Sequence, residues 1–265
     1  VASVDPSSPP TDTAGDRSNP ASSAPNDPGP AIELSADGVS LQSVGVDIAY
    51  NNTQEPGGVE LIASGDDTNI SDITFERTYG NNNGSPALAV RGSGVTVSNS
   101  SFGTSSNPGG PISLQGTDDA EIVGNDIQDT PEEGIWGSDL GDAELTIKNN
   151  TVDSHDTDGS GQREIKLVSQ PDSLNGETSL DDQFDTLLAD NTVNTVRIAG
   201  GDGVIAEESP SASNVYDLDT ALDEVGSGGF VRAEAGTYDR KAAGDQSVTL
   251  DSSGLTLRGA DGATI

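Results

Sequence analysis

Acidic side chains are the residues of this sequence that could do chemistry, and one segment spaces them like a metal-binding loop. Asp156 and Asp158 alternate ahead of a glycine, and Glu164 follows them. Alternate carboxylates before a glycine are typical of calcium loops, because calcium binds carboxylate and carbonyl oxygens. The equivalent EF-hand loop would run from Ser154 to Ile165, and neither end supplies the usual carboxylate. A calcium site at Asp156, Asp158 and Glu164 is one hypothesis, and a solvated acidic loop is the other.

Other catalytic groups are sparse. The sequence has no Cys and 1 His, His155, which leaves a histidine-based nucleophile relay with a single candidate base. Carboxylate pairs spaced as in glycosidases arise by chance among 45 acidic residues. No catalytic residue and no cofactor other than calcium is therefore predicted.

Glycan attachment is a further possible role for polar side chains. Five Asn-X-Ser/Thr sequons would be usable in an extracellular setting, although a chain rich in Asn, Ser and Thr contains such triplets by chance. Aromatic residues, on which sugar rings stack, make up only 3% of the chain, and Trp136 is the single tryptophan. Surface glycans are therefore a candidate partner that the sequence neither requires nor excludes. The sequons are Asn51, Asn69, Asn83, Asn99 and Asn149.

The charge balance excludes several partners and suggests an environment. With 45 acidic and 11 basic residues, the net charge is −34. Nucleic acid needs clustered Lys and Arg, and no apolar run approaches the roughly 18 residues of a membrane span, so neither nucleic-acid binding nor membrane insertion is expected. Molar salt would screen the self-repulsion. We therefore expect an extracellular or cell-surface protein of a halophile; intrinsic disorder, the alternative, conflicts with the regular apolar pattern described next.

A repeat of about 25 residues is the strongest feature of the sequence. Six segments begin with an aliphatic residue and end with an apolar residue five positions later, and their last residues are 29, 27, 25, 25 and 41 positions apart. A second short strand lies about midway in each repeat, and Gly, Asn, Asp and Ser fill the gaps. No helical pattern is recognised between the strands. The six segments are 41–46, 70–75, 97–102, 122–127, 147–152 and 188–193, and the second strands are 58–62, 87–90, 111–114, 134–136 and 164–168.

This spacing predicts an all-β solenoid, a right-handed parallel β-helix of roughly eight or nine coils, each stacked about 4.8 Å from the previous one. Asn125, Asn150 and Asn191 occupy the same place in successive repeats. We expect their side-chain amides to form an inward-facing ladder at a turn where Asn tolerates left-handed backbone. The alternative is that Asn is simply common in turns.

The repeat pattern resembles the pectin-lyase-like β-helix superfamily, especially its surface members, over residues 37–205 and 216–265. The resemblance implies the fold, whereas the superfamily's activities range from lyases and hydrolases to viral spikes and inert surface proteins. An enzyme of this family would need a cluster of Asp or Arg on one exposed strand face. The arginines of this chain are instead dispersed over positions 17, 77, 91, 163, 197, 232, 240 and 258.

Residues 206–265 look like the opening of a β-helix of this family. Leu218, Ala221, Leu222 and Val225 form the stripe of a short amphipathic cap helix, and strands are expected to follow it. The expected organisation is a first-coil strand and Pro-rich loop over 1–36, coils over 37–205 and the cap helix with opening coils over 206–265. A tandem array or polymer, a truncated second β-helix and a circular permutant would all produce this order.

The most favoured function is an extracellular structural or adhesive protein, the repeating unit of a surface fibre or layer, whose partners are further copies end to end. A polysaccharide lyase or glycoside hydrolase is the alternative from another class, and a halophilic virus spike or tail fibre is a third.

Overall fold

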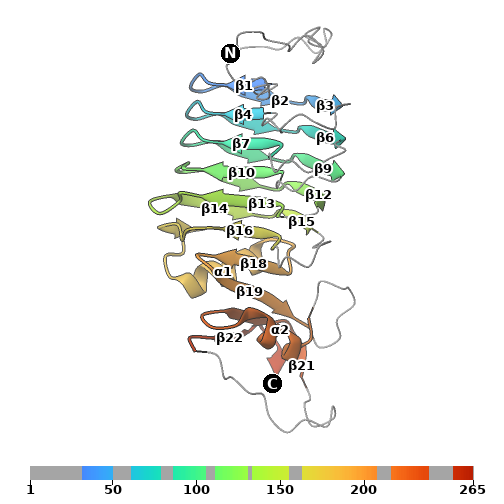
Figure 1. Cartoon of the computed structure of the whole chain (residues 1–265), viewed down its shortest axis with the longest axis vertical. Helices are drawn as coiled ribbons and strands as arrows, with labels where there is room; N and C mark the ends of the chain where they lie inside the picture. Colours follow the sequence, from blue (N-terminus) through green and yellow to red (C-terminus); the bar gives the residue numbers. More distant parts are fainter. Residues whose placement is uncertain are drawn as a thin grey trace, which may run out of the picture.

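The computed structural model describes residues 32–49, 61–78, 86–105, 111–130, 133–154, 163–207, 216–238 and 253–264. Their strands stack into a solenoid, with β1 near one end of the molecule and β22 near the other (Figure 1). This all-β, parallel architecture confirms the fold predicted from the repeat.

The midway strands of the repeats form one sheet that runs the length of the molecule. It has ten strands, and its first seven are parallel neighbours in sequence order. The ten described strands, in their order across the sheet, are β1 (Ile32–Leu34), β4 (Leu61–Ala63), β7 (Leu88–Val90), β10 (Ile112–Gln115), β13 (Ile135–Ser138), β16 (Ile165–Leu167), β18 (Thr195–Ile198), β19 (Gly201–Ala206), β20 (Phe230–Ala233) and β22 (Thr256–Gly259).

The first five of the six repeated segments, from 41–46 to 147–152, each contribute to two strands rather than one. A residue with positive φ bends each segment, so its halves enter a six-stranded and a five-stranded sheet. The bend residues are Ser43, Asp72, Asn99, Gly124 and Asn149. The six strands are β2 (Ser40–Gln42), β5 (Asn69–Ser71), β8 (Thr96–Ser98), β11 (Glu121–Val123), β14 (Glu144–Lys148) and β17 (Ser173–Leu174), and the five are β3 (Gly45–Ala49), β6 (Thr74–Thr78), β9 (Ser101–Ser105), β12 (Asp126–Thr130) and β15 (Thr151–Ser154).

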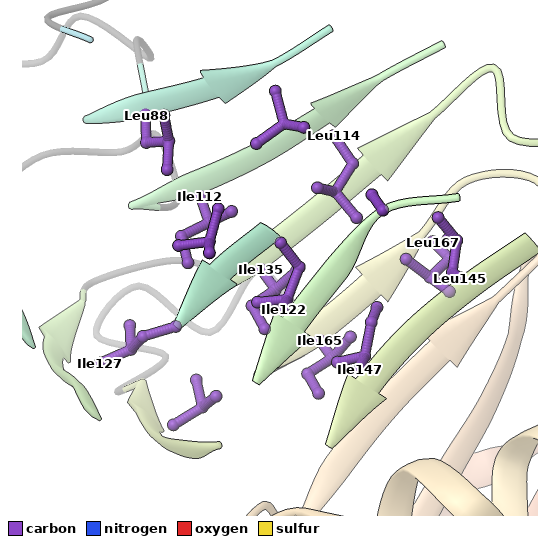
Figure 2. Packing of buried hydrophobic residues seen from close by; sticks show 14 of the residues in the cluster. Leu88, Ile112, Leu114, Ile122, Ile127, Ile135, Leu145, Ile147, Ile165 and Leu167 are labelled. Atoms are coloured by element: carbon purple, nitrogen blue, oxygen red, sulfur yellow. The ribbon is translucent and has the colours of Figure 1, made fainter. Parts of the chain in front are cut away.

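Aliphatic side chains from all three sheets fill the space between them. Leu88, Ile112 and Leu114 point into the same interior as Ile122 and Ile147 (Figure 2). Equivalent residues of neighbouring coils pair directly, as Ile112 does with Leu88 on one side and Ile135 on the other. The core is therefore a stack of like residues, and burial of these rows is the main favourable term in the fold.

A helix that the repeat analysis did not recognise interrupts the last coil. The segment 188–193 was expected to be a strand like the others, but Leu188 lies in α1 (Leu180–Asp190). The spacing of 41 residues before it reflects this inserted helix. Ser179 caps α1, since its hydroxyl accepts from the Asp182 backbone N–H, and Phe184, Leu187 and Leu188 close the end of the core.

The long sheet reverses direction after α1. β19 pairs antiparallel with β18, and β20 and β22 then continue parallel to β19. The buried side chains change faces there, because Ile205 belongs to the first core whereas Val204 and Ala206 belong to a second. α2 (Leu218–Val225) covers this second core, as the predicted cap helix would.

The first solenoid has fewer coils than expected, because the reversal at β19 ends it and starts the second core. The six-stranded sheet counts six coils in the first solenoid, not eight or nine. The remaining strands belong to the second core, where β21 (Gly236–Thr237) pairs in parallel with β23 (Ala263–Thr264).

Candidate functional site: the joint between two cores and the open ends

The three predicted ladder residues are hydrogen bonded in series inside the solenoid. Nδ2 of Asn125 donates to Oδ1 of Asn150 at 3.0 Å, and Nδ2 of Asn150 donates to Oδ1 of Asn191 at 3.0 Å. The same oxygens also accept the backbone N–H groups of Asn125 and Asn150. Ser100 extends the row, because its N–H donates to Oδ1 of Asn125 at 3.0 Å.

The backbone of this row is not left-handed, contrary to the expectation from sequence. The positive φ belongs to the residue before, as at Gly124 and Asn149, while Asn191 has a φ of −127°. The ladder asparagines are thus selected for their amides rather than for their backbone conformation.

Of the candidate calcium ligands, the structure describes only Glu164; Asp156 and Asp158 lie outside the described residues. Glu164 is buried, and its Oε2 accepts the N–H groups of Asn194 and Thr195, both at 2.6 Å. Those contacts anchor the loop that leads into β18. Among the described residues, no three His, Asp or Glu side chains form a group that would hold a metal ion.

Four arginines that are dispersed in the sequence lie together where the first solenoid meets the second core, a region called the joint below. They are Arg163, Arg197, Arg232 and Arg258. Arg163 is buried and reaches Asp202 at 3.2 Å and Glu224 of α2 at 2.7 Å. Arg197 forms a two-point contact with the same Asp202, at 2.6 and 3.0 Å. Asp202 therefore connects two arginines of the first solenoid to the strand that starts the second.

Arg232 of β20 and Arg258 of β22 bind carboxylates of α1 and so join this helix to the strands that carry the second core. Asp185 accepts from Arg232 and, at 2.8 Å, from Arg258, which also reaches Asp182 at 3.0 Å. The Phe184 and Phe230 rings stack with centroids 5.9 Å apart. The acidic residues were missed because α1 was missed; the apolar spacing of Leu180, Phe184, Leu187 and Leu188 (i, i+4, i+7, i+8) was the available indication.

These contacts shift the pKa values of Arg163 and Asp182. Burial lowers the pKa of Arg163, but the contacts with Asp202 and Glu224 outweigh it and raise the pKa above its ordinary value. The Ser179 hydroxyl and then the Arg258 guanidinium lower the pKa of Asp182. Both shifts favour the charged form, so Arg163 and Asp182 act as fixed charges at neutral pH rather than as proton donors or acceptors.

The predicted glycosylation sites lie either on the surface of the first solenoid or outside the described residues. Asn69, Asn99 and Asn149 are exposed on the first solenoid, and Asn51, Asn83 and His155 lie outside the described residues. Arg91 donates through Nε to Oε1 of Gln115 at 2.9 Å. Glycosylation stays a prediction.

The two ends of the molecule expose half-covered apolar residues. At one end, among the described strands, β1 pairs only with β4, and Ile32 and Leu34 are half-buried. At the other end, the described strand that pairs with β22 is β20, and Leu255 and Leu257 are half-buried against the second core. Both edges of the long sheet are thus open within the described part of the chain.

Residues 35–162 match a protein family described as the right-handed beta helix region. No curated protein and no solved structure matches the chain. Together with the parallel ladders, the match identifies the solenoid as a right-handed parallel β-helix, the fold of the pectin-lyase-like superfamily. None of the described helices has the length and apolar character needed to cross a membrane.

Proposed function

We propose that this chain is an extracellular structural or adhesive protein of a halophile, serving as the repeating unit of a surface fibre or layer. The observation that carries the proposal is the ten-stranded sheet, whose hydrogen-bonded ladder runs through the whole described molecule and ends in an open edge at each end. Such an edge is a template for a further strand, and edges at opposite ends favour assembly in a line.

The arrangement of charge supports this role over the enzymatic alternative. A polysaccharide lyase or hydrolase would require an Arg and several carboxylates that converge in a groove and are available to a substrate. In the described residues, Arg163, Arg197, Arg232 and Arg258 are instead engaged by carboxylates at the joint. Their positions suit them to hold two cores together.

Sedimentation velocity and negative-stain electron microscopy in about 2 M salt, where charge repulsion is screened, test the proposal. We expect linear assemblies that lengthen with protein concentration, and no turnover of acidic polysaccharides with or without calcium. A closed trimer would favour the spike alternative. A monomer that releases unsaturated or reducing-end products, with activity lost on substitution of one acid, would establish an enzyme instead.

A further inference from the structure

The last described segment repeats half of a coil of the first solenoid. The sequence 255–265, LTLRGADGATI, aligns without a gap with 112–122, ISLQGTDDAEI. The structure is similar as well, because β22 and β23 overlap the aligned residues of β10 and β11 with an offset of one residue. In both segments the turn contains a left-handed residue at the same place, Asp119 with φ 52° and Gly262 with φ 90°.

Equivalent residues of the two segments differ in how well they are covered. Ile112, Leu114 and Ala120 are 0% exposed, because β10 and β11 each have a coil on both sides. The matching Leu255, Leu257 and Ala263 are only half-buried, because within the described part of the chain β22 and β23 each pair on one side. The second core therefore has a coil position next to β22 that no described residue of this chain fills.

The opposite end of the molecule presents a strand of the matching pattern. The register of the long sheet places Ile32 at the coil position of Leu61, Leu88 and Ile112, and the sequence alignment places Leu255 there too. Leu34 corresponds in the same way to Leu257. β2 likewise occupies the coil position of β11, and therefore of β23.

We propose that a second copy of this chain continues the second core, with its β1 pairing in parallel with β22 and its β2 pairing in parallel with β23. The register sets Ile32 opposite Leu255, Leu34 opposite Leu257 and Ser40 opposite Thr264. The inference rests on the proposed function and specifies its contact.

A turn carboxylate supports this register. Within one chain, Oδ1 of Asp37 accepts the N–H of Asp66 in the next coil, and Oδ1 of Asp66 accepts the N–H of Ser93. Asp118 does the same for Glu144. Asp261 occupies the position of Asp118 and is exposed, so its carboxylate is placed to accept the N–H of Asp37 from the added copy.

The reversal at β19 determines how successive copies are oriented. Because β19, β20 and β22 run opposite to β1–β18 and bury the other face, the second core is related to the first by about half a turn around an axis along the stack. This operation preserves the right hand of the coil and the direction of growth. Repeated copies would therefore alternate between the two faces of one continuous sheet, in an open, non-closing assembly.

Single-cysteine variants of this cysteine-free chain test the register. Glu33→Cys is mixed with Thr256→Cys, and Ser40→Cys with Thr264→Cys, in about 2 M salt under mild oxidation. Each of these pairs sits directly opposite across the proposed contact, within the roughly 4.4–6.8 Å Cα separation that a disulfide spans. The crossed mixtures, Glu33→Cys with Thr264→Cys and Ser40→Cys with Thr256→Cys, join different sheets and serve as matched controls.

We expect at least about tenfold more cross-linked dimer from the matched than from the crossed mixtures, since the crossed positions lie outside disulfide reach. Assemblies that sediment normally while matched and crossed mixtures cross-link equally, or not at all, would overturn this register and leave the proposed function standing. Absence of any assembly would overturn both. Helical reconstruction provides a second test, because units related by a rotation near zero would exclude the alternating arrangement.

Discussion

Asn125 and Asn150, 25 residues apart in the sequence, are joined inside the solenoid by a hydrogen bond of 3.0 Å from Nδ2 to Oδ1. Oδ1 of Asn150 also accepts the Asn125 N–H at 3.0 Å, and Nδ2 of Asn150 donates to the Ile122 carbonyl at 2.8 Å. One buried side chain therefore adds three hydrogen bonds at the bend to those of the sheet ladders, and the Asn125 N–H between β11 and β12 is among the groups it satisfies. Because each ladder asparagine must reach the asparagine of the next coil, the ladder constrains the repeat length, as the stacked apolar residues also do.

Asn150→Ala is expected to destabilise the fold by about 2–4 kcal/mol, because it removes the acceptor of the buried Asn125 N–H together with the side-chain bonds to Asn125 and to the Ile122 carbonyl. Chemical denaturation at constant high salt measures the change. Lys148→Ala, at an exposed neighbouring position, is the control and should stay within about 0.5 kcal/mol of the parent protein. Equal effects of the two substitutions would contradict a structural role for the ladder.

Gly92 lies at a turn where consecutive coils approach too closely for a side chain. A Cβ there would lie 2.3 Å from the carbonyl oxygen of Gly65 in the preceding coil, whereas a Cβ at Gly141 would meet nothing within 4 Å. Gly92→Ala should therefore destabilise the protein by about 1–3 kcal/mol, and Gly141→Ala should have little effect. Thermal unfolding of the two variants checks this; a neutral Gly92→Ala would show that the turn can widen.

Much of this fold was predictable because each coil must place like residues on like residues. The apolar positions of the segments from 41–46 to 147–152 recur at nearly constant spacing, and the structure pairs Ile70 with Val97 and Ile122 with Ile147 as that spacing requires. The stacking of Asn125 on Asn150 follows from the same argument. Periodicity therefore specified both register and ladder.

Features that depend on a single break in the repeat were not predictable in this way. α1 occurs once, so Leu180, Phe184 and Leu187 were not supported by equivalents in other coils. The sheet reverses at a two-residue turn formed by Ala199 and Gly200, both with positive φ. The alternation of apolar and polar residues in the flanking strands is the same for a parallel and an antiparallel neighbour, so it does not predict the reversal. The ion pairs of the joint depend on both features, which is why the arginines read as dispersed in the sequence.

Asp185 is expected to be the main tie between α1 and the second unit, because it contacts both Arg232 and Arg258. Asp185→Asn should lower the free energy of unfolding by about 1–2 kcal/mol, a value reduced from that of a fully buried pair because these groups are partly exposed. Asp223→Asn, on the exposed face of α2, is the control with little expected effect. Hydrogen exchange of β20 and β22 should increase in the first variant only.

Acid should loosen the first turn of α1. The pKa of Asp182 is lowered first by the hydrogen bond from the Ser179 hydroxyl and then by Arg258. A carboxylate with a folded-state pKa below its unfolded value stabilises the fold above the unfolded pKa, and this contribution is lost as the pH falls through the folded pKa. Ser179→Ala should therefore raise the pKa of Asp182 toward the ordinary value of an aspartate side chain. Carbon-13 NMR titration measures it, and an unchanged pKa would exclude the hydroxyl as the cause.

Salt dependence is the prediction that follows from the net charge of −34 and from the way coils bring acids together. Asp66 and Asp67 occupy a turn of one coil, and Asp118 and Asp119 occupy the same turn two coils later, all of them exposed. Like charges on stacked turns repel, and the screening length shrinks from about 10 Å at 0.1 M salt to about 3 Å at 1 M. We expect the melting temperature to fall markedly below about 0.5 M salt, as dialysis followed by circular dichroism would detect.

A variant with Asn at these four positions separates charge repulsion from other effects of salt. Asn keeps the side-chain oxygen that Asp66 and Asp118 offer to the N–H groups of Ser93 and Glu144, and it tolerates the left-handed backbone of Asp67 and Asp119. The folded contacts should therefore survive while four negative charges are removed. If repulsion is the cause, the melting temperature of the variant should exceed that of the parent at low salt, and the two should converge at molar salt. Parallel melting curves for both proteins across the whole salt range would contradict this account, and a parent protein equally stable at millimolar and molar salt would remove the physical ground for a high-salt habitat.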